Sequence, residues 1–115
     1  MAIAHKVENN QLVVAGRTIK FECKIAEIVE TMDRLIVRLD NPGGTQLNRN
    51  IYALGSSGEK LWQIEESPYG GVAENSYVRL WMDEHENICA SVFQGIDYIV
   101  NVEDGSVSAA GFRRF

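Results

Sequence analysis

Two segments of the same design constrain the fold of this chain most strongly. Residues 51–62 read Ile-Tyr-Ala-Leu-Gly-Ser-Ser-Gly-Glu-Lys-Leu-Trp, and residues 98–107 read Tyr-Ile-Val-Asn-Val-Glu-Asp-Gly-Ser-Val. In each, a β-rich run is followed by a small polar turn closed by glycine and then by a second β-rich run. Glycine adopts positive φ without steric cost, so this pattern is typical of a β-hairpin. The repetition predicts an all-β protein assembled from a repeated unit.

Alternating polarity predicts further strands. Residues 17–25 alternate apolar and polar side chains, which indicates a half-buried strand with Cys23 in the core. Residues 35–39 place leucine and valine on one face and Ile36 and Arg38 on the other. Between residues 77 and 82, the same period sets Val78, Leu80 and Met82 opposite Tyr77, Arg79 and Trp81. We expect about nine or ten short antiparallel strands in a β-sandwich or a barrel-like sheet, with little helix.

Size and composition predict one domain covering residues 1–115. A chain of 115 residues buries roughly two-thirds of the surface that its unfolded form exposes, which is enough for a hydrophobic core without disulfides or structural metals. Its hydrophobic fraction of 45% and charged fraction of 23% are ordinary for a soluble globular protein. Only residues 27–30 also fit a short helical turn.

The charge balance argues against nucleic acid as a partner. Eleven lysines and arginines are scattered among sixteen acidic residues, for a net charge of -5. Binding to phosphate groups depends on clustered basic side chains, which this chain lacks. An acidic surface favours a basic protein partner and speeds the encounter with it.

The chain reads as a cytoplasmic protein without membrane contact. Residues 1–6 lack the apolar stretch of a signal peptide, and no run reaches membrane-spanning length. Cys23 and Cys89 are far apart in the sequence, and free thiols in a reducing compartment are favoured over a single disulfide.

No motif indicates catalysis, a cofactor or a metal. The chain has no Cys-x-x-Cys, His-x-x-x-His or Gly-x-Ser-x-Gly pattern. The acidic residues around His85 read as a solvated hairpin tip, and the only other histidine is His5. We therefore expect no enzyme activity. A hydrolase or metalloenzyme would need His5 and His85 close to other ligands.

The first hairpin resembles the blade signature of quinoprotein-type β-propellers. The residues that carry the resemblance are Tyr52-Ala53-Leu54, Ser56-Ser57-Gly58 and Leu61-Trp62. Two such units cannot close a propeller, so the resemblance implies the pairing of strands and no quinone cofactor.

Over most of its length the chain is similar to a group of small stand-alone bacterial proteins, mostly uncharacterised. The resemblance is carried by residues 8–12, 19–22, 48–50, 61–66 and 95–100, although residues 112–115 read Phe-Arg-Arg-Phe where the group has a threonine-lysine tail. Some similar small acidic proteins are immunity proteins that neutralise a cognate toxin. The resemblance thus implies an all-β fold and an immunity role.

Together these observations predict a non-enzymatic protein-binding domain whose acidic surface occludes the basic active site of a toxin. The alternative is a small-molecule-binding β domain with Trp62, Trp81 and Tyr98 around a pocket. Pairing of two copies through an open edge strand is a further expectation. The expected partner contacts are Glu65, Glu66, Tyr69, Glu74, Asp83, Glu84 and Glu86.

Overall fold

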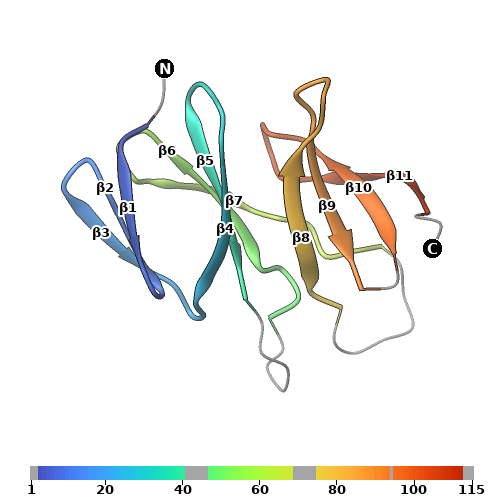
Figure 1. The fold of residues 1–115 in the computed structure, drawn as a ribbon, viewed down its shortest axis with the longest axis horizontal. Coiled ribbons are helices and arrows are strands. Elements are labelled where there is room, and N and C mark those ends of the chain that lie inside the picture. Colours follow the sequence, from blue (N-terminus) through green and yellow to red (C-terminus); the bar gives the residue numbers. More distant parts are fainter. Residues whose placement is uncertain (1–2, 41–46, 69–74, 94, 113–115) are drawn as a thin grey trace.

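The computed structural model describes residues 3–40, 47–68, 75–93 and 95–112, and these ranges contain antiparallel strands and no helix (Figure 1). The N-terminal sheet consists of β1 (His5–Glu8), β2 (Gln11–Val14) and β3 (Arg17–Lys20). The middle sheet consists of β4 (Ile25–Glu30), β5 (Arg34–Leu39), β6 (Ile51–Gly55) and β7 (Lys60–Gln63). The C-terminal sheet consists of β8 (Tyr77–Met82), β9 (Ile88–Val92), β10 (Ile96–Val100) and β11 (Val107–Phe112).

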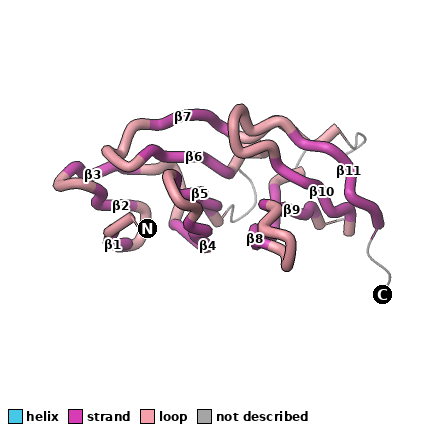
Figure 2. Tube along the Cα trace, turned by 90° about the horizontal axis from the view of Figure 1, so that it is seen from above, coloured by secondary structure: helices cyan, strands magenta, loops and turns pink. Residues whose placement is uncertain are grey.

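Within each sheet, strands that follow one another in the sequence are neighbours in space. The predicted all-β, antiparallel fold is confirmed, and none of the three sheets described closes into a barrel. The sheets follow one another across the molecule with the middle sheet between the other two (Figures 1 and 2).

The two inner strands of the middle sheet, β5 and β6, are buried on both faces. Leu35, Val37 and Leu39 of β5 face the N-terminal sheet, whereas Ile36 faces the C-terminal sheet. This division confirms the predicted faces of residues 35–39. β6 follows the same rule, and all five of its residues are buried. Strands buried on both faces carry near-continuous apolar runs, which explains the composition of these two.

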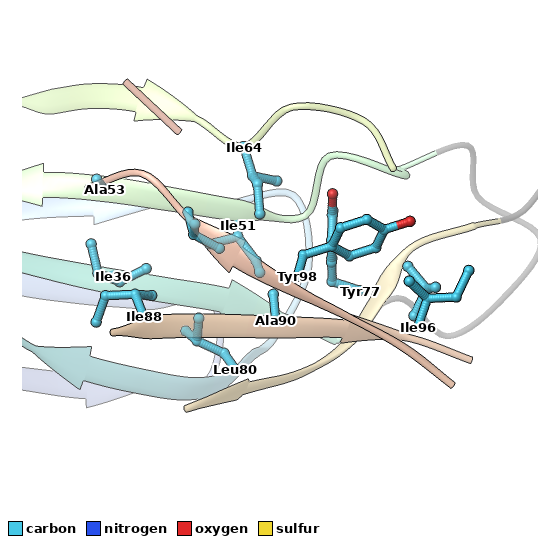
Figure 3. Close-up of a cluster of buried hydrophobic side chains, with 12 residues drawn as sticks. Ile36, Ile51, Ala53, Ile64, Tyr77, Leu80, Ile88, Ala90, Ile96 and Tyr98 are labelled. Atoms are coloured by element: carbon cyan, nitrogen blue, oxygen red, sulfur yellow. The ribbon is translucent and has the colours of Figure 1, made fainter. Parts of the chain in front are cut away.

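Two hydrophobic cores result from this arrangement. The N-terminal core contains Leu12, Val14, Ile19, Phe21, Ile25, Leu35, Val37, Leu39, Tyr52 and Leu54. The C-terminal core, shown in Figure 3, contains Ile36, Ile51, Ala53, Ile64, Tyr77, Leu80, Ile88, Ala90, Val92, Ile96, Tyr98 and Val100.

The predicted faces of Tyr77 and Val78 are wrong because β8 contains a β-bulge, whereas residues 79–82 keep the predicted alternation. Tyr77 is paired with Val92 and Arg79 with Ser91, so Val78 is an extra residue. A bulge shifts the alternation by one residue. Tyr77 and Leu80 therefore both enter the C-terminal core, whereas Val78 lies at the surface. Met82 is on the same face as Leu80 and is exposed because β8 ends there.

The single strand predicted for residues 17–25 is also wrong. β3 ends at Lys20, β4 begins at Ile25, and the two strands belong to different sheets. The link is fixed by hydrogen bonds from the Phe21 N–H to the Asn10 carbonyl and from the Ile25 N–H to the Asn9 carbonyl, both 2.9 Å. Cys23 is consequently half-buried beside the N-terminal core instead of inside it.

The structure also decides the conformation of residues 27–30 and the number of strands in the described residues. Residues 27–30 belong to β4, so they are extended and not helical. The described residues form eleven strands, because residues 17–25 supply parts of two.

Asn50 joins the middle sheet to the edge of the C-terminal sheet. Its side chain is fully buried, and its Nδ2 donates to the carbonyls of Leu39 and Tyr77, each at 2.8 Å. Its Oδ1 accepts the N–H of Tyr77 at 2.8 Å. One side chain thereby satisfies backbone groups of β5 and β8 that would otherwise be buried without partners.

An ion pair between Glu27 and Arg38 covers the same edge. Glu27 Oε1 accepts hydrogen bonds from Arg38 Nε and from the Leu80 N–H of β8. The guanidinium of Arg38 also lies 3.4 Å from the Tyr77 carbonyl. The facing edges of the two sheets are therefore joined by side chains instead of a continuous strand ladder.

Candidate partner-binding site

Three turns meet around an open hollow of about 520 Å³, which we call the methionine groove. The turns are the β4–β5 connection, the β8–β9 hairpin tip and the segment after β10, and the first two lie at the top of Figure 1. The groove is lined by Glu30, Thr31, Met32, Asp33, Met82, Glu86, Ile88 and Val102. Four of these side chains are apolar and three are carboxylates.

The β4–β5 turn presents Met32 to solvent. Thr31 and Arg34 close the turn, because the Thr31 N–H donates to the Arg34 carbonyl at 2.9 Å and the Arg34 N–H donates to Thr31 Oγ1 at 3.1 Å. Met32 and Asp33 form the tip, and Met32 remains 84% exposed. An exposed methionine is a flexible, polarisable contact that adapts to different partner surfaces.

The β8–β9 tip is organised by Asp83. Its Oδ1 accepts the N–H groups of His85 and Asn87 at 2.9 and 2.8 Å. These donors, that of Asn87 foremost, hold the pKa of Asp83 below its ordinary value. Asp83 thus stabilises its own hairpin, while Glu86, which has a positive φ of 62°, lines the groove.

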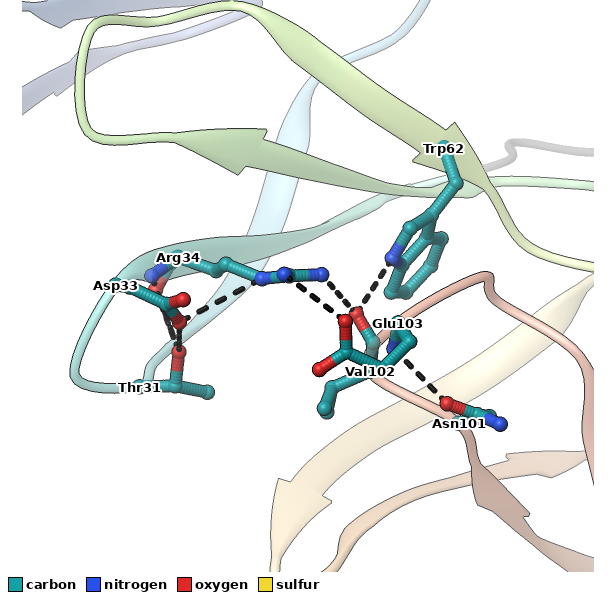
Figure 4. A network of polar contacts seen from close by, with 7 residues as sticks. All are labelled: Thr31, Asp33, Arg34, Trp62, Asn101, Val102 and Glu103. Atoms are coloured by element: carbon teal, nitrogen blue, oxygen red, sulfur yellow. Dashed lines mark hydrogen bonds and ion pairs between the residues drawn. The ribbon is translucent and has the colours of Figure 1, made fainter.

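The segment after β10, which contributes Val102 to the groove, is held in place by Arg34 and Trp62 (Figure 4). Both side chains donate to the carbonyl oxygen of Val102, Trp62 Nε1 at 2.8 Å. Arg34 also lies 3.4 Å from Glu103 and 3.5 Å from Asp33. The groove is therefore formed before any partner arrives, because β5, β7 and the segment after β10 are locked together.

The side chains that line the groove carry negative charge and no positive charge of lysine or arginine. Its lining contains three carboxylates and no lysine or arginine. The whole chain has the same asymmetry: residues 1–64 hold eight basic and seven acidic side chains, whereas residues 65–115 hold three basic and nine acidic ones. The second half of the chain therefore carries most of the net negative charge.

The seven predicted contact residues do not form one site. Glu86 lines the methionine groove, and Glu84 is exposed beside His85, 3.7 Å away. Glu65 and Glu66 line a separate polar hollow of about 350 Å³ together with Arg49, Gln63, Asp104 and Ser106. The two hollows share no lining residue. Tyr69 and Glu74 lie outside the described residues.

Within the polar hollow, both glutamates also have local partners. Glu65 Oε1 accepts the Val107 N–H at 2.8 Å, and Glu66 Oε1 accepts Asn48 Nδ2 at 3.3 Å. Glu65 therefore helps to position the start of β11.

The three aromatic side chains of the predicted small-molecule pocket do not line a common hollow among those described. Tyr98 is 1% exposed, with its ring edge-on to Tyr77 at 6.2 Å and its hydroxyl 2.7 Å from that of Ser67. Trp62 packs at the rim of the C-terminal core, and Trp81 is half-buried on β8. None of the three lines either hollow described above.

The cysteines and histidines form no reactive cluster in the described ranges. Cys23 and Cys89 are both free thiols. Burial, helped by the nearby charge of Asp83, raises the pKa of Cys89 and so lowers its thiolate fraction. The described residues include no group of three or more His, Cys, Asp or Glu able to hold a metal ion. They also include no helix long and apolar enough to cross a membrane.

Sequence reasoning missed Glu30, Met32, Asp33 and Met82. Residues 31–34 separate two apolar segments, 27–30 and 35–39, so a turn at this position could have suggested an exposed Met32. Met82 had no such signal, because it shares the face of the buried Leu80 and is exposed only where β8 ends.

Comparison with known proteins gives one match. A family described as "Domain of unknown function (DUF7957)" matches residues 2–112. No curated protein and no solved structure matches the chain.

Proposed function

The chain belongs to the DUF7957 family, and from this premise we propose that it is a non-enzymatic protein-binding domain whose methionine groove receives a basic segment of a partner protein. The observation that carries the proposal is the composition of the groove. Met32, Met82, Ile88 and Val102 offer an apolar floor, and three carboxylates surround it. Apolar contact with complementary charge at the rim is the usual anatomy of a protein interface.

The partner segment we expect has apolar side chains flanked by lysine or arginine. The apolar side chains fill the floor, where Met32 is the most exposed contact. The basic side chains pair with Glu86 and compete with Arg34 for Asp33 and with His5 for Glu30, pairs whose atoms lie 3.5 and 3.3 Å apart. Such pairs at a solvent-exposed rim contribute mainly to the rate of association and to specificity.

We further propose that the partner is a bacterial toxin and that binding occludes its basic active site. The resemblance to small immunity proteins and the net charge of -5 support this identification. Cytoplasmic binding of the toxin is part of the same proposal.

A titration with defined peptides tests the groove. The probe is a short peptide of alternating lysine and leucine, and the control has glutamate in place of lysine. We expect the lysine peptide to shift the methyl NMR signals of Met32 and Met82 and the amide signal of Glu86, with little change at the amide of Glu66. Equal shifts with both peptides, or shifts confined to the polar hollow, would contradict the proposal.

Variants of the groove test whether it is the surface that binds the toxin. Tagged wild-type protein and a Met32→Asp/Met82→Asp variant are compared in capture from the native host, with Glu66→Ala as the control outside the groove. We expect wild type and Glu66→Ala to retain the same basic toxin and to inhibit it, and the double variant to lose both properties. Inhibition that survives in the double variant would overturn the role of the groove.

A further inference from the structure

The three carboxylates at the rim of the methionine groove differ in the partners that they already have. Asp33 Oδ1 lies 3.5 Å from Nε of Arg34. Glu30 Oε1 lies 3.3 Å from Nδ1 of His5. That nitrogen is also 2.8 Å from the carbonyl of Ile3, which can only accept a hydrogen bond, so Nδ1 carries a hydrogen. Two of the three carboxylates are therefore engaged before a partner arrives.

Glu86 is the rim carboxylate without a basic partner among the described residues. Its side chain is exposed at the β8–β9 tip, and no described lysine, arginine or histidine forms an ion pair with it. A cation that approaches Asp33 also meets the guanidinium of Arg34, whose charge repels it. A cation at Glu86 displaces no basic side chain of the described chain. Glu86 is thus the carboxylate that a partner cation neutralises most easily.

The backbone of Glu86 is held in an unfavourable conformation. Its φ is 62°, in the left-handed region that glycine occupies without steric cost. The Glu86 N–H donates to the Asp83 carbonyl at 3.1 Å, and the Asp83 N–H donates to the Asn87 carbonyl at 2.9 Å, so the tip is fixed. Strained residues of this kind concentrate at functional sites. Here the strain places a carboxylate where glycine would fit the turn better.

We propose that Glu86 is the residue that gives the methionine groove its preference for a basic segment. The inference rests on the proposed function and names the carboxylate that performs the recognition. One lysine or arginine of the partner pairs with Glu86, while the apolar side chain beside it fills the floor of the groove. Glu30 and Asp33 keep the partners that they already have and add only weak attraction at longer range.

Two peptides and a set of charge-neutralising variants test this assignment. One peptide alternates lysine and leucine, and the other has glutamine in place of lysine, so it lacks the positive charge without gaining a negative one. Dissociation constants are measured by NMR titration for wild type, Glu86→Gln, Glu30→Gln and Asp33→Asn. The salt concentration is about 0.15 M, where exposed charges more than about 8 Å apart are largely screened. The control is Glu84→Gln, because Glu84 is an exposed carboxylate of the same tip that does not line the groove.

We expect wild type to bind the lysine peptide roughly threefold more tightly than the glutamine peptide. Glu86→Gln should lose this preference, whereas the other three variants should keep most of it. A preference that survives in Glu86→Gln, or that disappears in Glu30→Gln or Asp33→Asn, would overturn the inference. Equal binding of both peptides to wild type would also overturn it but would leave the apolar groove as a binding surface. No binding of either peptide would overturn the proposed function, and this inference with it.

The stability of Glu86→Gly separates recognition from a structural role. This variant should lose the preference for the lysine peptide, yet unfold at the same or a higher urea concentration than wild type, because glycine adopts positive φ without strain. A structural role of the Glu86 side chain predicts the reverse, a lower urea midpoint with an unchanged preference. That result would count against Glu86 as the recognition residue.

Discussion

Replacement of Asn50 by alanine tests how the middle and C-terminal sheets are held together. The substitution removes three hydrogen bonds of 2.8 Å from a side chain with no solvent exposure. The Tyr77 N–H and the Leu39 carbonyl then lose these partners, while the Tyr77 carbonyl keeps Arg38 nearby at 3.4 Å. Each buried polar group left unsatisfied costs about 1–3 kcal/mol, so the two together cost about 4 kcal/mol.

Urea unfolding followed by circular dichroism measures this loss. A decrease of about 4 kcal/mol is a large part of the roughly 5–15 kcal/mol that stabilises an ordinary domain, and it lowers the Tm by roughly 15 °C. The matched control is Asn101→Ala, because Asn101 is exposed and its Oδ1 accepts one N–H, that of Glu103. We expect the control to lose no more than about 1 kcal/mol. Equal losses for both variants would refute the reasoning, since solvent would then be satisfying the Tyr77 N–H.

Two further predictions concern the turn after β10 and the N-terminal core. Gly105→Ala should destabilise the protein by about 2–4 kcal/mol in urea unfolding and shift the NMR signals of Val102. The reason is that Gly105 has a φ of +80° and an added Cβ would lie 2.5 Å from the Trp62 ring. Unchanged stability would show that the ring moves freely. Burial, reinforced by the carboxylate of Glu22, raises the pKa of Tyr52 to about 12, so the folded state keeps this proton while the unfolded state loses it near pH 10. Stability should therefore fall as the pH rises from 10 to 12, and less steeply in Tyr52→Phe; identical pH profiles of the two proteins would contradict this assignment.

The hairpins and the inner strands could be predicted from the sequence. Gly58 and Gly105 adopt φ values of +87° and +80°, as the two glycine-closed turns required. The faces of residues 35–39 were also correct, because the strand is regular and side chains alternate along it. These are local properties, set by neighbours within a few positions in the chain.

The errors all occur where an irregularity interrupts the alternation. The bulge at Val78 and the break between Lys20 and Ile25 leave no signature in polarity, because the residues on both sides still read as strand. A shift of one residue exchanges the two faces of a strand. It moved Tyr77 into the C-terminal core and Val78 out to the surface.

The candidate site could likewise be predicted only in part from the sequence. The sequence alone indicated acidic, exposed turns, and Glu86 was among the residues named from it. It could not indicate that Glu86 and Met32 line one groove while Glu65 and Glu66 line another hollow. That depends on which turns meet, and contacts between residues distant in the chain decide it.

The amino-acid sequence by itself thus determined the strand content, the hairpin turns and the apolar faces of β5 and β6, because each follows from the period of two and from glycine at the turns. Only the tertiary structure decided how the three sheets stack and where an apolar floor meets an acidic rim. The physical reason is that Asn50, Arg34 and Trp62 act on backbone groups far away in the sequence. Those bonds form only when the sheets have already come together.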